Sequence, residues 1–149
     1  MQKSFELTKR QNQAWEVLGS DARHVLLYGG SRSGKTFLIM RAIITRALVH
    51  KSRHVALRFR FNHVKTSVVH DTLPKVMELC FPGVGAHCQL DKSDWFYALP
   101  NGSEIWFGGL DDKQRTEKIL GGEYASIFLN ECSEIPYSGR NMALTRLAQ

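Results

Sequence analysis

The sequence has no stretch of about 18 consecutive apolar residues, the length needed for a helix that crosses a membrane. Its first residues lead into charged sequence rather than into the apolar core of a secretion signal. It also has no internal repeat and no low-complexity segment. With 149 residues, 43% of them hydrophobic and 23% charged, the chain has the size and composition of a globular domain. We therefore expect one domain over residues 1–149, without a membrane-embedded part.

Cysteine is scarce, with only Cys80, Cys88 and Cys132 in the chain. Three cysteines cannot form a fully paired disulfide framework, and Cys80, His87 and Cys88 lack the spacing of zinc ligands. We predict reduced thiols, as in a cytosolic protein. Acidic residues are also outnumbered, 14 against 20 basic ones, and the formal charge of +6 suits a polyanionic partner without proving one.

Residues 29–36 read G-G-S-R-S-G-K-T, the G-x-x-x-x-G-K-T pattern of phosphate-binding loops. An apolar run short enough for a buried strand, residues 24–28, precedes them, and residues 36–44 follow with helical length. This arrangement turns backbone N–H groups and a helix N-terminus toward phosphate oxygens. A glycine-rich turn without a ligand is the weaker alternative. We predict a nucleotide-binding site formed by Gly29, Gly30, Ser31, Arg32, Ser33, Gly34, Lys35 and Thr36.

Two residues of this loop have specific chemical roles in the pattern. The ammonium of Lys35 would reach the β- and γ-phosphates, and the hydroxyl of Thr36 would hold Mg²⁺. The cofactors expected from the loop are therefore ATP and Mg²⁺.

The N-terminal region contains a candidate for adenine recognition. Thr8 is a suitable N-cap for an amphipathic helix that carries Gln11 and ends near Gly19. A glutamine amide offers both a donor and an acceptor, which suits the edge of adenine. The spacing of Phe5, Thr8 and Gln11 is similar to the glutamine motif of helicase-like ATPases. An ordinary amphipathic helix with an exposed glutamine explains the residues equally well, and Gln11 is preferred to Gln13 as the candidate.

The middle of the chain is rich in strand signals. Residues 54–59 are predicted to form a strand parallel to residues 24–28, because a helix connects the two. A helix over residues 64–79 should break or kink at Pro74. Three short strands with polar turns between them then indicate an antiparallel meander at the sheet edge. These strands are residues 87–90, 95–99 and 104–107.

Basic and aromatic residues in this region have two interpretations each. The end of the strand at residues 54–59 carries Arg58, Arg60, His63 and Lys65, which either touch nucleic-acid phosphates or, as we favour, belong to a solvated strand end. The meander aromatics are expected to be core residues or cross-strand pairs rather than base-stacking platforms. These aromatics are Trp95, Tyr97, Trp106 and Phe107.

An apolar strand within residues 124–131 ends in Asn130 and Glu131. Sites on parallel sheets lie beyond the carboxyl ends of the strands, so we expect Glu131 opposite the phosphate loop. A carboxylate there can orient an attacking water and accept its proton. Asn130 could accept a hydrogen bond from a metal-bound water but brings no charge. A plain core strand with a polar end is the alternative. Residues 141–149 predict a helix with Ser138 as a candidate cap.

Together these residues resemble the ATPase domain of phage terminase large subunits, the DNA-packaging motors. The resemblance runs from about Leu7 to Gln149. Its most specific part is the Asn-Gly-Ser passage at residues 101–103, which leads to Gly-Leu-Asp-Asp at 109–112 and then to Asn-Glu at 130–131. It implies a P-loop α/β fold, with a mainly parallel sheet flanked by helices and an antiparallel edge.

The resemblance also implies partners and a setting. It implies an ATPase that drives double-stranded DNA into a procapsid, working as a homo-oligomeric ring with a portal protein and a small terminase subunit. The expected location is the host cytoplasm during virion assembly. Arg32 would act in cis on the γ-phosphate and Glu131 as the general base, while Arg115 or Lys118 is a candidate for a group acting on a neighbouring subunit.

Two departures from the family bear on activity. Asn130 replaces the usual aspartate, and the sequence ends before the family's coupling motif and nuclease domain. We therefore expect no nuclease activity from these residues and a sheet that lacks its last strands. A non-hydrolysing or truncated nucleotide-binding module, or another P-loop DNA motor such as a helicase, is the alternative function.

Overall fold

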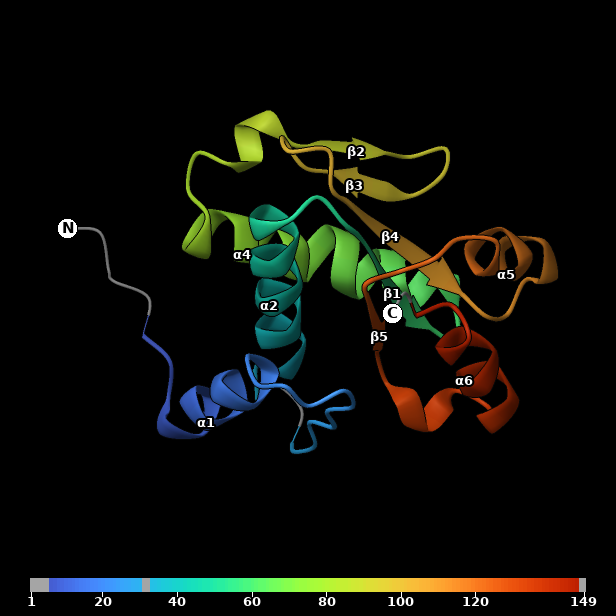
Figure 1. The fold of residues 1–149 in the computed structure, drawn as a ribbon, viewed down its shortest axis with the longest axis horizontal. Helices are drawn as coiled ribbons and strands as arrows, with labels where there is room; N and C mark the ends of the chain where they lie inside the picture. The colour runs from blue at the N-terminus through green and yellow to red at the C-terminus, as the bar shows by residue number, and fades with distance from the viewer. Residues whose placement is uncertain (1–5, 31–32, 148–149) are drawn as a thin grey trace.

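The computed structural model describes residues 6–30 and 33–147. These residues form an α/β fold around a five-stranded sheet in the order β2-β3-β4-β1-β5 (Figure 1). The strands are β1 (Arg53–Arg58), β2 (Gln89–Asp91), β3 (Phe96–Ala98), β4 (Glu104–Gly109) and β5 (Ser126–Leu129). β4, β1 and β5 are parallel, whereas β2 and β3 add an antiparallel edge next to β4. The predicted fold class, with its edge meander, is confirmed.

Helices cover both faces of the sheet (Figure 1). One face carries α2 and a long helical segment made of α3, a π-helix and α4, while α5 and α6 lie on the other face and α1 packs against α2. The helices are α1 (Lys9–Leu18), α2 (Lys35–Val49), α3 (Phe61–Val64), the π-helix (Lys65–Thr72), α4 (Leu73–Cys80), α5 (Lys113–Leu120) and α6 (Tyr137–Leu144). No helix in the described ranges is long and apolar enough to span a membrane.

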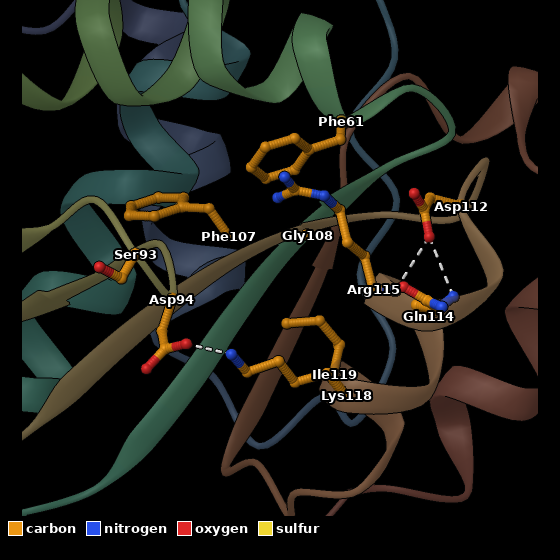
Figure 2. Close-up of a pocket in the computed structure, with 10 residues that line it drawn as sticks. All are labelled: Phe61, Ser93, Asp94, Phe107, Gly108, Asp112, Gln114, Arg115, Lys118 and Ile119. Carbon is orange, nitrogen blue, oxygen red and sulfur yellow. Dashed lines mark hydrogen bonds and ion pairs between the residues drawn. The ribbon is translucent and has the colours of Figure 1, made fainter.

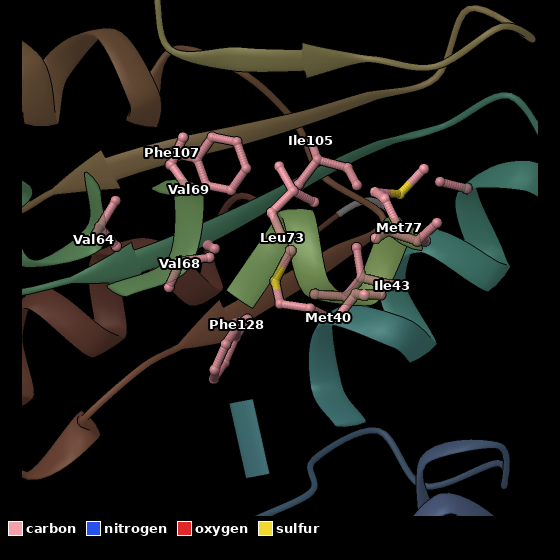
Figure 3. Packing of buried hydrophobic residues seen from close by; sticks show 14 of the residues in the cluster. Met40, Ile43, Val64, Val68, Val69, Leu73, Met77, Ile105, Phe107 and Phe128 are labelled. Atoms are coloured by element: carbon pink, nitrogen blue, oxygen red, sulfur yellow. The ribbon is translucent and has the colours of Figure 1, made fainter. Parts of the chain in front are cut away.

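The strand β1 is buried on both of its faces. Ile105 and Phe107 belong to the larger core cluster (Figure 3). Ala56 packs toward this cluster, whereas Val55 and Leu57 pack toward the smaller one. This division follows from the two-residue repeat of a strand, because successive side chains point to opposite faces. A strand covered on both faces reads as a continuous apolar run, which is why the sequence identified β1.

The predicted strand at residues 24–28 is wrong. These residues have no regular secondary structure, and Leu26 and Tyr28 are 70% and 89% exposed. Just before β5, an isolated β-bridge joins Tyr124 to Leu147. No described strand pairs with residues 24–28, and the parallel neighbours of β1 are instead β4 and β5.

The helix predicted for residues 64–79 begins earlier and is not uniform. It starts at Phe61 and is π-helical from Lys65 to Thr72 before α4 begins. Pro74 lies in the first turn of α4, where its missing N–H costs least. The irregularity predicted at Pro74 thus takes the form of a change from π-helical to α-helical hydrogen bonding just before this proline.

The predicted C-terminal helix has the wrong boundaries. α6 begins after Pro136 and ends at Leu144, so Ser138 lies inside its first turn and does not cap it. The helix ends early because the backbone N–H of Tyr124 donates to Arg146 O, which ties the following residues to the lead-in of β5. The last two residues of the chain lie outside the described ranges.

The meander aromatics have the predicted structural roles. Trp106 stacks on Phe96 of the neighbouring strand at a centroid distance of 4.7 Å, and Trp95 meets Phe61 edge-to-face at 5.8 Å. Phe107 is fully buried, and Tyr97 packs against the same core cluster. Cys80, Cys88 and Cys132 are free thiols.

Candidate nucleotide-binding site

The phosphate-loop pattern leads directly into α2. Gly34 is the N-cap of this helix with a φ of +82°, a left-handed conformation that strains any residue with a Cβ atom. Lys35 and Thr36 form the first helical positions, so the N-terminal backbone of α2 faces the loop. Ser31 and Arg32 lie outside the described residues, and their predicted roles remain predictions.

The side chain of Lys35 folds back over the loop. Its Nζ donates hydrogen bonds to Gly29 O at 2.9 Å, to Gly30 O at 2.9 Å and to Ser33 Oγ at 3.1 Å. An ammonium has three donors, and all three are directed at the loop that it belongs to. The ammonium is therefore held within the loop, where it can exchange these acceptors for the oxygens of a bound anion.

Gln11 connects α1 to this loop. Its Nε2 donates to Ser33 O at 3.2 Å, while its Oε1 accepts from the backbone N–H of Thr8 at 2.9 Å. Thr8 Oγ1 accepts from the N–H of Gln11 in turn, which completes a capping box at the start of α1. The structure thus brings Gln11 to the predicted site, with both ends of its amide bonded to the backbone.

Asn130 and Glu131 follow β5 at the carboxyl edge of the parallel strands. Asn130 is 5% exposed and its N–H donates to Leu57 O at 2.8 Å, so β5 stays joined to β1 up to this residue. Glu131 is exposed and has a φ of +49°, one of two non-glycine residues with positive φ among those described. Such backbone strain of order 1–3 kcal/mol persists only where surrounding structure holds it, and it clusters at functional sites.

The loop and the end of β5 lie at the same end of the molecule (Figure 1). The start of α2 and the end of β5 both point to the lower end in that view. Within the described residues, no ion pair or hydrogen bond joins Glu131 to Lys35. The structure therefore places the two groups at one edge without a direct contact between them.

Arg58 also belongs to this edge, which the sequence did not indicate. It ends β1, next to β5, and its Nε lies 3.8 Å from Glu134 Oε2 while its Nη1 donates to Ser67 Oγ at 3.4 Å. The predicted solvated strand end is thus wrong for Arg58, which is turned toward an acid, and holds for the exposed Arg60 and His63. Its place near the carboxyl end of the strand predicted for residues 54–59 was the available signal.

The chain is similar to known proteins in sequence and in fold. The family model described as phage terminase large subunit matches residues 21–149. No curated protein sequence matches. Among solved structures, the large terminase of the thermophilic bacteriophage D6E is similar with a TM-score of 0.77 at 15% identity, over 95% of this chain and 36% of that one.

The same phage protein has also been solved with nucleotides. Its complex with ADP matches with a TM-score of 0.71 at 14% identity, over 94% of this chain and 36% of that one. Its complex with ATP-γ-S matches with a TM-score of 0.69 at 14% identity, over 95% and 35% of the two chains. At these identities the likeness shows a shared fold, and the chain spans about a third of the length of the structures that it matches.

Proposed function

Because the chain belongs to the phage terminase large subunit family, we propose that it hydrolyses ATP as part of a motor that moves double-stranded DNA into a procapsid. The observation that carries the proposal is the glycine loop before α2, to whose backbone the Lys35 ammonium donates hydrogen bonds. The D6E terminase structures with ADP and ATP-γ-S support nucleotide binding. The proposed partners are a portal protein, a small terminase subunit and further copies of the chain in a ring, in the infected host cell.

In this proposal the loop residues bind the triphosphate. Lys35 exchanges its hydrogen bonds to Gly29 and Gly30 for phosphate oxygens, and the N-terminal N–H groups of α2 approach the same anion. Arg32 contributes positive charge where negative charge develops on the γ-phosphate. Gln11 holds the loop through Ser33, and the adenine is its second proposed contact.

The residues present fit a magnesium ion that is bound mainly through phosphate oxygens and water. The described residues contain no group of three or more His, Cys, Asp or Glu side chains that could hold a metal. Mg²⁺ keeps several waters and commonly uses few protein ligands at phosphate sites. Thr36 would supply a hydroxyl ligand, and Asn130 would contact a metal-bound water. When bound, the ion neutralises charge on the phosphates.

Glu131 is the proposed general base. Glu131 follows β5 at the edge of the sheet where the loop lies. It is exposed, has a strained backbone, and lies after the last paired residues of the strand. A carboxylate in this place can take the proton of the water that attacks the γ-phosphate. Hydrolysis therefore depends on this carboxylate, whereas triphosphate binding depends on Lys35.

A nucleotide-binding module without turnover is the second candidate function. It is favoured by Asn130, which supplies no charge near the metal, and by residues 24–28, which precede the loop but belong to no strand. A phosphate loop whose preceding residues are not anchored in the sheet can bind a nucleotide without holding the γ-phosphate and the attacking water in place for reaction. This function also uses Lys35, but not Glu131.

Steady-state ATP hydrolysis, measured with and without duplex DNA, separates the candidates. The proposed function predicts magnesium-dependent phosphate release that DNA stimulates. ATP binding without phosphate release would favour the non-hydrolysing module and exclude the motor function for this chain.

A further inference from the structure

A cavity with a volume of about 370 Å³ lies beside the carboxyl end of β4 (Figure 2). Its walls are α5, the end of β4, Phe61 at the start of α3, and the turn between β2 and β3. No described residue of the phosphate loop lines it. Its chemistry is therefore separate from the nucleotide site.

Two glycines at the end of β4 allow this cavity to form. A Cβ atom on Gly109 would lie 2.4 Å from the backbone N of Phe61, and one on Gly108 would lie 2.8 Å from Ile119 Cγ1. α3 and α5 can thus approach β4 more closely than a side chain would permit. The N–H of Phe61 donates to Asp111 Oδ1 at 3.2 Å, which fixes the Phe61 wall.

The carboxylates around the cavity already have partners. Asp111 accepts from Phe61, and Asp112 Oδ1 accepts from two first-turn N–H groups of α5 at 2.9 Å and 3.2 Å. Asp94 is paired with Lys118 across the cavity (Figure 2). These two side chains are 41% and 54% exposed, and ion pairs in water contribute little to stability, so Lys118 can exchange Asp94 for another anion.

Two cations beside the cavity have aromatic partners instead. The guanidinium of Arg115 lies 4.2 Å from the ring centroid of Phe61 (Figure 2), and Lys65 Nζ lies 4.5 Å from that of Trp95 and 5.8 Å from that of Phe61. Within residues 6–30 and 33–147, neither cation has an ion pair. A ring face holds a cation in place but accepts none of its hydrogen bonds strongly, so the N–H donors stay available.

Trp95, whose ring meets Phe61 of the cavity wall edge-to-face, is held in an unusual conformation. Its φ is +60°, which is a left-handed value in a residue with a bulky side chain, and its carbonyl accepts from Phe107 N–H at 2.9 Å. The preceding turn is fixed by Asp91 Oδ1, which accepts from Ser93 N and Asp94 N at 2.8 Å each. Strain of this kind persists where the surrounding structure determines it. The rings that position Lys65 and Arg115 are therefore preset.

We propose that this cavity binds a backbone phosphate of duplex DNA, through Arg115 with Lys65 and Lys118 beside it. A guanidinium fork matches phosphate oxygens, and backbone phosphates dominate the affinity of proteins for DNA. The cavity offers cationic side chains, whereas a nucleotide triphosphate is typically bound by the backbone N–H groups of a glycine-rich loop. A backbone phosphate therefore suits it better than a nucleotide. This proposal rests on the proposed function, because that function is the reason for choosing DNA as the ligand.

The test is fluorescence anisotropy of a labelled DNA duplex across a salt series, with the parent chain, Arg115→Gln and Lys51→Gln. The control Lys51 is an exposed cation next to Gly102, at the opposite edge of the sheet. One phosphate contact contributes a slope of about 0.9 in log K against log salt. Arg115→Gln should therefore lower the slope by about 0.9 and weaken binding about eightfold at about 0.1 M salt. Lys51→Gln should change neither.

Further measurements separate this site from the nucleotide site. Arg115→Lys keeps the charge but loses the fork, so it should retain the salt slope and bind more weakly than the parent. ATP affinity, measured without DNA, should be unchanged in Arg115→Gln, because no described residue of the phosphate loop lines the cavity. The assignment is overturned if Arg115→Gln and Lys51→Gln behave alike, if the parent binds no duplex, or if Arg115→Gln changes ATP turnover but not DNA binding. Absence of ATP hydrolysis with DNA binding intact would instead count against the proposed function alone.

Discussion

His54 should make the stability of the fold depend on pH. It lies in β1, between β4 and β5, and is 1% exposed, with Nε2 2.8 Å from Ser52 Oγ. Its Nδ1 is buried and has no hydrogen-bond partner within the described residues. Burial, and secondly the nearby charge of Arg46, lowers the pKa of His54 from 6.5 to about 4. The folded chain therefore keeps this imidazole neutral at pH values where the unfolded chain protonates it.

The sign and size of the effect follow from proton linkage. A histidine with a lowered pKa contributes its full stability above the unfolded pKa of 6.5, and the contribution is lost as pH falls toward about 4. Each unit of pKa difference corresponds to about 1.36 kcal/mol. The loss relative to pH 7 should therefore be about 2 kcal/mol at pH 5 and approach about 3 kcal/mol at pH 4.

Urea unfolding curves of the parent and His54→Leu between pH 7.5 and pH 4.5 test this. Leucine has a similar volume and removes the titrating group, so the free energy of unfolding should fall less steeply in the variant. The hydrogen bond to Ser52 contributes about 1 kcal/mol, and the two proteins should differ by no more than that at pH 7.5. Parallel pH profiles for the parent and variant would refute the reasoning, because other acids titrate equally in both.

Two substitutions test the proposed catalytic edge. Glu131→Gln keeps the shape and hydrogen bonding of the side chain but removes its basicity. ATP should therefore bind with parental affinity in calorimetry while phosphate release is lost. A fully active variant would exclude Glu131 as the base. Asn130→Asp adds a negative charge near the proposed magnesium position, where Coulomb attraction is of order a few kcal/mol before desolvation. Hydrolysis by this variant should need less Mg²⁺ and be at least as fast as in the parent, and an unchanged magnesium titration would show that residue 130 does not face the metal.

Local signals in the sequence predicted much of the fold. The Thr8 cap predicted α1, the apolar run predicted β1, and the polar turns predicted the meander, because each depends on residues within a few positions of one another. The phosphate loop and Gln11 were also identified from local patterns, and the structure joins them through Ser33. The catalytic roles assigned to this loop and to Glu131 remain predictions.

The errors arose where distant residues decide the structure. Residues 24–28 have the composition of a strand, but a strand also requires a neighbouring strand, and composition does not reveal that partner. The end of α6 depends on a hydrogen bond from Tyr124, far away in the sequence. Arg115 and Phe61 likewise meet only because Gly109 lets α3 approach β4. Neither contact has a signal in its own stretch of sequence.

ATP binding to the parent chain and to Lys35→Ala, measured by calorimetry with Mg²⁺ present, tests the nucleotide site most directly. The ammonium of Lys35 supplies the positive charge at the centre of the loop, so the parent should bind ATP and the variant should lose most of that affinity. Thermal unfolding should show that the variant is still folded. Equal ATP affinity in the two folded proteins would contradict the assignment of residues 29–36 as the phosphate-binding loop.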